Sequence, residues 1–273
     1  MVIDNSHHAS IAPLLKWPGG KRFVLKFLLS IVPKRFDHYY EPFLGGGALF
    51  FALHPARAIL SDNNAELINF YVQVRDHPNE LIDHLQKLHN IKEEYYRIRH
   101  DIPVDKIARA ARLMYLANLS FNGIFRVNLK GEFNVPYGYK THLQICDPAR
   151  IQAASALLAS VQFQCDDFEA SVQSASAGDL VYLDPPYTLA HQNNGFIKYN
   201  SKIFSWDDQI RLANLANELL NRGCKIIVSN ANHPSIINLY ANFQMRLVER
   251  ASVIAANSRF RRKTTECIFF SGV

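Results

Sequence analysis

The segment GDLVYLDPPYT places an acid, two prolines and a tyrosine after a run of apolar residues. The apolar run predicts a buried strand, so Asp184, Pro185, Pro186 and Tyr187 follow at its carboxyl end, where open α/β sheets bind ligands. Consecutive prolines fix φ and remove two N–H donors, which leaves a stiff turn presenting carbonyls, a carboxylate and a ring. Asp184 and the Pro185 carbonyl can each accept one N–H of an exocyclic amine while Tyr187 stacks on a base. A rigid loop with no ligand is the disfavoured alternative.

A second candidate site is the glycine turn in EPFLGGGALFF. Glycine permits positive φ and close approach of a ligand to the backbone, and a helix that starts at once offers unpaired N–H groups. The segment lacks the later glycine of GxGxxG and the GK[ST] ending of a phosphate loop, so it matches neither motif. A tight strand-to-helix turn without a ligand is an equally good interpretation of this segment alone.

The next strand ends in AILSDNN, which places Asp62 at its tip. An acid about 20 residues beyond a glycine turn is where nucleoside-binding α/β folds hold the ribose hydroxyls. Asp62 or Asn63 could also cap the helix that begins near Ala65, with Glu66 completing a capping box. The turn and Asp62 together favour a ligand that contains a nucleoside and needs little pyrophosphate binding.

Short apolar segments that alternate with helical periodicity must position these groups. We predict strands at His38–Phe43, Ala58–Ser61, Ser160–Cys165, Asp179–Leu183, Lys225–Ser229, Met245–Val253 and Glu266–Phe270. Helices are predicted at Gly47–Leu53, Ala65–Val74, Trp206–Asn221 and Pro234–Ala241. This alternation is typical of a doubly wound, largely parallel α/β sheet. The last two strands are separated only by a polar basic loop, so we expect them to form an antiparallel hairpin at the sheet edge.

The alternation stops between His77 and Asp147. A long charged helix over Asn79–His100, a second helix over Val104–Leu119 and a Gly/Asn-rich stretch predict an inserted, mostly helical subdomain. We therefore expect a sheet domain of residues 1–76 and 147–273 and an insert of residues 77–146. The dipeptides Asn122-Gly123 and Lys130-Gly131 predict a β-hairpin within the insert.

Composition bounds the class of protein. The chain has 273 residues, of which 48% are apolar and 20% charged, which excludes disordered and fibrous proteins. The formal net charge of +6 suits an anionic partner such as nucleic acid or an anionic membrane surface. The four cysteines lack paired spacing, and no histidine has a spacing that commends a metal site. With no secretion signal and no apolar run of about 18 residues, we expect a cytoplasmic protein without membrane or metal.

Six segments in order resemble the Dam-type (D12 class) DNA adenine-N6 methyltransferases, which use S-adenosylmethionine. They are LLKWPGGK, EPFLGGGALFF, LSDNNAEL, FNGIFRVNLKGEFNVPYG, VYLDPPYT and NSRFRRKTTE, and they run from about Leu14 to Phe270. DPPY alone is shared with other amino-methylating enzymes, whereas the FNG…NVPYG segment is far more selective. The resemblance implies a Rossmann-like S-adenosylmethionine-dependent methyltransferase sheet carrying a helical DNA-recognition insert.

The resemblance also implies a set of cofactor contacts. LLKWPGGK would hold the methionine end of the cofactor, Asp62 its ribose, and Asp167 with Phe168 its adenine, although Asp166 is equally well placed. Without the resemblance, KWPGGKR is an exposed turn before a helix; Pro18 stands where family members often have alanine. The implied cofactor-binding residues are Trp17, Gly19, Gly20, Lys21, Pro42, Phe43, Gly45, Gly47, Asp62, Asn63, Asp167, Phe168 and Asp184.

The insert is expected to recognise DNA. Arg126 can contact guanine with two hydrogen bonds, and the family uses this position for base readout. The RFRRK run could hold phosphates, and a solubilising surface is an equally good interpretation of it; for the insert, a solvated hairpin with incidental charge is the weaker alternative. The expected DNA-binding residues are Phe121, Asn122, Ile124, Arg126, Asn128, Lys130, Pro136, Arg259 and Arg261.

These observations predict a site-specific enzyme that methylates N6 of adenine in double-stranded DNA at GATC-like sites, with the base flipped out of the duplex. Asp184, Pro185, Pro186 and Tyr187 would be its catalytic residues. Cytosine-N4 methylation, RNA adenine-N6 methylation and a catalytically silent DNA-binding protein remain alternatives, and a nicotinamide oxidoreductase is a distant one. We expect a monomer or weak dimer associated with the nucleoid, and restriction-modification is one of several possible biological roles.

Overall fold

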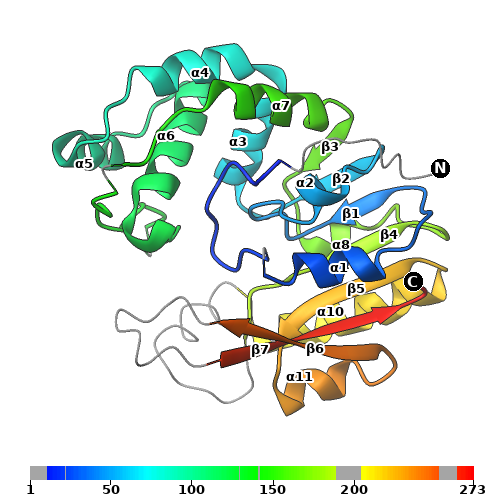
Figure 1. Cartoon of the computed structure of the whole chain (residues 1–273). Coiled ribbons are helices and arrows are strands. Elements are labelled where there is room, and N and C mark those ends of the chain that lie inside the picture. The colour runs from blue at the N-terminus through cyan, green and yellow to red at the C-terminus, as the bar shows by residue number, and fades with distance from the viewer. Residues whose placement is uncertain (1–10, 22, 129, 141, 189–203, 252–262) are drawn as a thin grey trace.

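A seven-stranded sheet forms the centre of the molecule, in a computed structural model that describes residues 11–21, 23–128, 130–140, 142–188, 204–251 and 263–273 (Figure 1). The strand order is β3-β2-β1-β4-β5-β7-β6, and β7 runs antiparallel to both β5 and β6. The predicted α/β class, the seven strands and the antiparallel edge hairpin are confirmed. The strands are β1 (Tyr39–Glu41), β2 (Ala58–Ser61), β3 (Val161–Gln164), β4 (Leu180–Leu183), β5 (Lys225–Ala231), β6 (Gln244–Ala251) and β7 (Lys263–Ser271).

Both faces of the sheet are covered. Along β4, Leu180 and Tyr182 point into one core while Val181 and Leu183 point into the other, because successive side chains of a strand alternate between faces. Strands buried on both sides are apolar without alternation, as the sequence showed. The first core is closed by α1 (Leu25–Ile31), α2 (Phe50–Leu53) and α3 (Ala65–Asp76), and the second by α8 (Phe168–Ser171), α10 (Trp206–Asn221) and α11 (Pro234–Leu239).

The strand order reverses between β1 and β4, which pair in parallel. Ligands bind outside the carboxyl ends of strands at such a switch point. Glu41 ends β1 and Asp184 follows β4 at this edge. The antiparallel β7 pairs Glu266 with Ala231 at the end of β5, so β7 brings a further carboxylate to the same edge.

The predicted single helix over Asn79–His100 is wrong, because the chain forms two helices there. At the break, the His89 carbonyl accepts a hydrogen bond from the Tyr115 hydroxyl at 2.8 Å and the Asn90 carbonyl accepts one from Tyr137 at 3.2 Å. A continuous helix would use these carbonyls internally, so the buried tyrosines favour the interruption. The insert helices are α4 (Pro78–Gln86), α5 (Lys92–His100) and α6 (Lys106–Leu119); α7 (Pro148–Leu158) then leads to β3.

Helix α6 has two apolar faces. One face, including Leu113 and Met114, packs in the same core as α3 and the sheet. The other face, including Tyr115 and Leu119, packs with Tyr95 and neighbouring apolar residues in a small separate core. The helices at the upper left of Figure 1 therefore share one of their packing layers with the sheet domain.

The segment after α6 pairs with itself only at isolated positions. Val127 pairs with Phe133, and Ser120 with Tyr137, both antiparallel. The Asn128 side chain closes the turn between the first pair by accepting the backbone N–H groups of Lys130 and Glu132 at 2.9 and 3.0 Å. The FNG…NVPYG segment therefore lies against α5 and α6 as a short, irregular hairpin.

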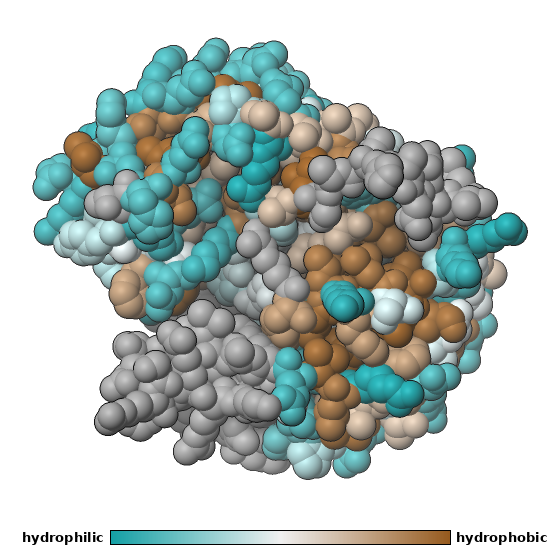
Figure 2. Space-filling model, in the orientation of Figure 1, coloured by the Kyte–Doolittle hydropathy of each residue, from teal (hydrophilic) through white to brown (hydrophobic). Residues whose placement is uncertain are grey.

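The surface, the helices and the cysteines can be compared with the features of membrane, metal-binding and disulfide-linked proteins. Figure 2 shows an apolar area over α1, where Phe23 and Leu29 are 37% and 39% exposed. Within the described ranges, no helix has the length and apolarity to cross a bilayer. The same residues contain no cluster of three or more metal-ligating side chains. All four cysteines are unpaired thiols.

Candidate active site

A buried ion cluster surrounds the corner after β4. The ammonium of Lys21 lies 3.0 Å from a carboxylate oxygen of Asp184 and 3.2 Å from one of Glu266. It also donates a hydrogen bond to the Tyr187 hydroxyl and lies 4.5 Å from the centre of that ring. Only 4% of Lys21 is exposed. One lysine thus fixes the acid and the ring of the DPPY corner together.

The carbonyls of the corner differ in how they are used. Gln209 on α10, which is fully buried, donates its side-chain N–H to the Pro186 carbonyl at 3.1 Å. Gln209 is itself held by the Asn230 amide at 2.9 Å. The Pro185 carbonyl accepts no hydrogen bond from any residue that the structure describes. The corner therefore offers one carbonyl and one carboxylate to an outside donor.

Two carboxyl groups at neighbouring strand ends have different proton affinities. Burial raises the pKa of Asp184 to about 6; the charge of Lys21 opposes the increase and that of Glu266 adds to it. Burial raises the pKa of Glu41 to about 8, against a hydrogen bond from the Tyr39 hydroxyl at 2.9 Å. Glu41 therefore holds its proton more tightly than Asp184 does. Separated proton affinities of this kind are typical of enzyme sites.

A cavity of about 80 Å³ lies beside the ends of β1, β2 and β3. The Phe43 ring is 5.5 Å from that of Phe168 and 5.6 Å from that of Phe204. Aromatic walls with carboxylates at the rim suit a nucleoside, whose base is flat and whose hydroxyl and amino groups donate hydrogen bonds. The lining residues are Pro42, Phe43, Asp62, Asn63, Asp166, Asp167, Phe168, Phe204 and Asp208, which include six of the expected cofactor-binding residues.

Asp62 fixes the glycine turn. One of its oxygens accepts the Gly45 backbone N–H at 3.1 Å, and the other accepts that of Asn64 at 3.0 Å. Burial raises the pKa of this carboxyl to about 6, while these two hydrogen bonds lower it. Each oxygen keeps a second lone pair. Asp62 can therefore hold the glycine turn and, at the same time, accept a hydrogen bond from a hydroxyl group of a ligand.

The start of α3 differs from the expectation. Asn64 is its N-cap, and its side chain accepts the backbone N–H groups of Glu66 and Leu67 at 3.1 and 3.3 Å. The Glu66 carboxylate pairs with an arginine of α6. The predicted capping by Asp62 or Asn63 is wrong, because the chain needs one more residue to leave β2 before the helix begins.

Trp17 joins the glycine turn to the insert. Its ring stacks on Phe125 with centroids 4.5 Å apart, and a Cβ on Gly45 would lie 3.0 Å from it. Gly45 has φ +48 and its carbonyl accepts the hydroxyl of Tyr71 on α3 at 3.0 Å. In the preceding loop, Gly19 has φ +81, which fits a tight turn with proline before it. Position 45 therefore requires glycine for two reasons: the positive φ, and the Trp17 ring that leaves no room for a side chain.

The expected DNA-binding residues fall into three groups. Phe121 is 51% exposed, and Asn122, Arg126, Lys130 and Pro136 are exposed as well. Arg126 donates its Nε–H to Asn134 at 2.8 Å, which leaves the two terminal nitrogens without a partner among the described residues. Ile124 and Asn128 are half-buried, and Asn128 is engaged in the turn. Arg259 and Arg261 lie outside the described residues.

The sequence interpretation assigned no role to four residues of the site. Glu41 and Glu266 are acids within apolar strands, and Gln209 is a buried polar residue on an amphipathic helix. Arg211 on α10 contacts Asp167. A charge inside an apolar strand was the available signal for the two glutamates, whereas nothing in the local pattern marked Gln209 or Arg211.

Comparison with known proteins settles the class of the protein. The family model for D12 class N6 adenine-specific DNA methyltransferases matches residues 17–254. The chain belongs to this family. A type II methyltransferase of Lactococcus lactis subsp. cremoris is 39% identical over 98% of both chains, and one of Methanocaldococcus jannaschii is 35% identical over 87% of this chain and 91% of its own. The DNA adenine methylase of Escherichia coli K12 is 30% identical over 93% of both. The predicted family and enzyme class are confirmed.

Proposed function

We propose that this protein transfers a methyl group from S-adenosylmethionine to N6 of adenine in double-stranded DNA. The carrying observation is the corner at Asp184–Tyr187, where the Asp184 carboxylate is paired with Lys21 and the Pro185 carbonyl has no donor among the described residues. These are the two acceptors that an exocyclic amine requires. The next residue, Thr188, donates a hydrogen bond to the carbonyl of Phe204, which lines the aromatic cavity. Family membership supports the same reaction.

The cavity residues fit S-adenosylmethionine as the donor. Asp62 suits the ribose hydroxyls, and Asp167 with Phe168 suits the adenine. Trp17, Lys21, Gly19 and Gly20 would lie toward the methionine end. When bound, the cofactor supplies a methyl group made electrophilic by a sulfonium. Pro42, Phe43, Gly45, Gly47 and Asn63 would complete the pocket around these groups.

The corner acts on the amine. The lone pair of adenine N6 is delocalised into the ring, which makes the nitrogen a poor nucleophile. Acceptance of its two N–H groups by Asp184 and the Pro185 carbonyl localises that pair, while Tyr187 and Pro186 fix the plane of the base. As the new C–N bond forms, the bond between the methyl carbon and the sulfonium sulfur would break and its electron pair would stay on sulfur, leaving a thioether. The methylated nitrogen then loses one proton to Asp184 or to water. Alignment at about 3–3.5 Å contributes more than a strong base would.

Recognition of DNA is assigned to residues 77–146. Adenine N6 lies inside the duplex, so the base must be flipped out at a cost of a few kcal/mol. Phe121 and Arg126 are exposed on this segment, and the net charge of +6 favours a polyanion. We propose short GATC-like sites, a monomer or weak dimer, and a location in the cytoplasm with the nucleoid. The type II relatives favour a role in restriction-modification.

Transfer of labelled methyl groups tests the function. Purified protein is incubated with S-adenosylmethionine and duplex DNA, and the product is mapped at base resolution. We expect N6-methyladenine at one short sequence. N4-methylcytosine, label in RNA only, or DNA binding without transfer would each support one of the alternative functions and contradict this one.

Replacement of Asp62 by alanine is expected to weaken S-adenosylmethionine binding by about 10- to 100-fold, because a charged acceptor is lost and the glycine turn loses one tie. Calorimetric titration measures this change. Asp105→Ala is a suitable control, because Asp105 caps α6 far along the chain and should leave the affinity unchanged. Unchanged binding by the Asp62 variant would refute its placement.

Replacement of Arg126 by alanine is expected to relax sequence choice, with about 1–3 kcal/mol of discrimination lost at one position of the site. Transfer rates on duplexes with single base substitutions give this number. Arg97→Ala removes a similar charge from α5, where Arg97 is 61% exposed and pairs with Glu94 and Asp101, and should preserve the ranking of sites. A defect confined to cofactor affinity would show that the insert has another role.

A further inference from the structure

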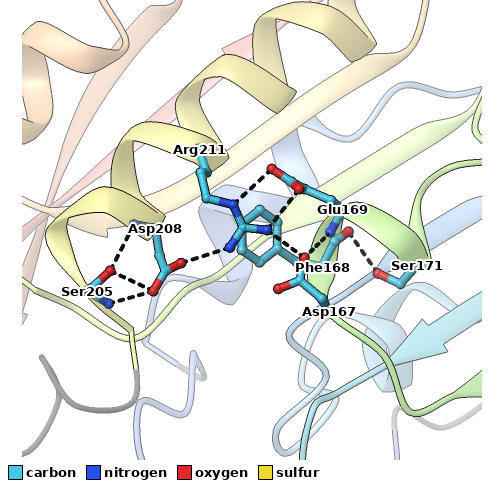
Figure 3. A network of polar contacts seen from close by, with 7 residues as sticks. All are labelled: Asp167, Phe168, Glu169, Ser171, Ser205, Asp208 and Arg211. Atoms are coloured by element: carbon cyan, nitrogen blue, oxygen red, sulfur yellow. Dashed lines mark hydrogen bonds and ion pairs between the residues drawn. The ribbon is translucent and has the colours of Figure 1, made fainter.

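Arg211 holds three carboxylates at the edge of the aromatic cavity (Figure 3). Its terminal nitrogens lie 2.9 Å from Asp167, 2.8 Å from Glu169 and 2.9 Å from Asp208. The guanidinium also lies over the Phe168 ring, 4.8 Å from its centre. One side chain of α10 therefore contacts both members of the pair expected to bind adenine.

The contact fixes the orientation of the Asp167 carboxylate. Arg211 and the Glu169 backbone N–H both donate to the same oxygen, at 2.9 and 3.0 Å. The second oxygen accepts no hydrogen bond from the described residues, and Figure 3 draws no contact to it. Asp166 and Asp167 both line the cavity, and of the two only Asp167 contacts Arg211. The ion pair thus keeps one oxygen occupied and one available.

The charges in this cluster favour a donor rather than an acceptor as ligand. Three acidic side chains contact one guanidinium, so acidic groups outnumber basic ones in this cluster. Partial burial alone would raise the pKa of Asp208, but hydrogen bonds from Ser205 and then Arg211 lower it, so this acid is ionised. A purine 6-amino group donates N–H to an ionised carboxylate, whereas a 6-oxo group presents a lone pair that the carboxylate repels.

We propose that Arg211 is a positioning residue that makes the cofactor cavity selective for a 6-amino purine. It does so by fixing the orientation of the Asp167 carboxylate through a hydrogen bond to one of its oxygens, and by contacting the Phe168 ring that would lie against the base. This inference rests on the proposed function, because it takes the cavity to be the site of the adenine of S-adenosylmethionine.

A purely structural role is the competing explanation, and the chain provides a matched control. Arg222 lies at the other end of α10, pairs with Glu218 and donates to the Gln173 carbonyl beyond α8. Its side chain is 36% exposed, against 41% for Arg211. Arg222 therefore joins the end of α10 to the residues that follow α8, without contacting the cavity carboxylates.

The test compares two ligands whose purines differ at C6, where an amino group is replaced by an oxo group, and at N1, which changes from an acceptor to an N–H donor. S-Adenosylhomocysteine and S-inosylhomocysteine are titrated calorimetrically into the wild-type protein and into Arg211→Gln, Arg211→Lys and Arg222→Gln. We expect the wild type and Arg222→Gln to prefer the adenosyl ligand by about 10-fold or more, as for a hydrogen bond to a charged group. In Arg211→Gln that ratio should fall toward 1. In Arg211→Lys the ratio should be intermediate, because lysine keeps the positive charge but lacks the planar guanidinium that donates to several carboxylates at once.

Kinetics provide a second readout. Arg211→Gln should raise the KM for S-adenosylmethionine about 10-fold and change kcat by less than about 2-fold at saturation, because Asp167 binds the donor and not the reacting amine. Equal weakening of both ligands, an unchanged ratio, or the same loss in Arg222→Gln would overturn the proposal. Failure of the wild type to bind either ligand would instead overturn the proposed function, and the positioning role with it.

Discussion

Replacement of Asp184 by asparagine is expected to lower the rate of methyl transfer by about 10²–10⁴-fold while the protein stays folded. The amide removes the charged acceptor for one N–H of the amine and presents a donor that opposes it. Single-turnover transfer to a DNA duplex measures the effect, and calorimetry checks that S-adenosylmethionine still binds.

Asp179 provides the control for this variant. It lies at the opposite end of β4, is 1% exposed, and accepts the backbone N–H groups of His38 and Ser176, both at 2.9 Å. Asp179→Asn should cost stability but leave the rate intact at a temperature where the protein is folded. Near wild-type turnover by Asp184→Asn, or an equal loss in Asp179→Asn, would contradict the catalytic assignment.

The acid limb of the rate profile gives an independent readout of Asp184. Because burial raises its pKa to about 6, the carboxylate should be lost as pH falls through about 6, and kcat with it. Asp62 has a similar pKa, so the profile of kcat/KM reports both groups. The pH dependence of kcat at saturating cofactor reports Asp184 alone, because Asp62 is then bound to the cofactor and its titration no longer affects the rate.

Replacement of Lys21 by methionine is expected to cost about 3–5 kcal/mol of folding free energy, because two buried carboxylates then face each other without a cation. The charge of Lys21 lowers the pKa of Asp184, so its removal raises that pKa above about 6. The folded state then binds a proton more tightly than the unfolded chain does. The loss of stability should therefore be smaller at pH 5 than at pH 8, as measured by urea unfolding at both pH values.

A double variant separates charge repulsion from lost packing. Glu266→Gln removes the second carboxylate 3.2 Å from the Lys21 ammonium. If repulsion dominates, Lys21→Met with Glu266→Gln should be more stable than Lys21→Met alone at pH 8. Additive losses in the two single variants would show that the cluster stabilises the fold by packing and not by charge.

Much of the fold could be predicted from local pattern. The apolar runs at β4 and β5 identify strands buried on both faces, and the short loop before β7 predicts an antiparallel hairpin. The interruption between α4 and α5 could not be predicted, because the tyrosines that use its carbonyls come from α6 and from the segment that follows it. Helical periodicity is local, whereas those hydrogen bonds are not.

The candidate site shows the same division. Asp184 and Tyr187 are adjacent in the chain and stiffened by proline, so their proximity follows from the sequence. Glu266 reaches Lys21 only because β7 pairs with β5, and Arg211 reaches Asp167 only because α10 packs on α8. Such contacts between distant segments depend on tertiary packing, which a single sequence does not encode in its spacing.

The two apolar faces of α6 determine how site preference could be re-engineered in this family. Exchange of residues 77–146 between relatives would replace the face of α6 that packs against α3. Tyr71 lies on α3, so its hydrogen bond to the Gly45 carbonyl would lose the packing that supports it. Chimaeras between relatives should therefore exchange only the loop that runs from residue 120 to residue 138. Helix α6 beneath that loop packs in the core of the sheet on one face and against α5 on the other, so an exchange that tests the proposed recognition segment should leave these helices together.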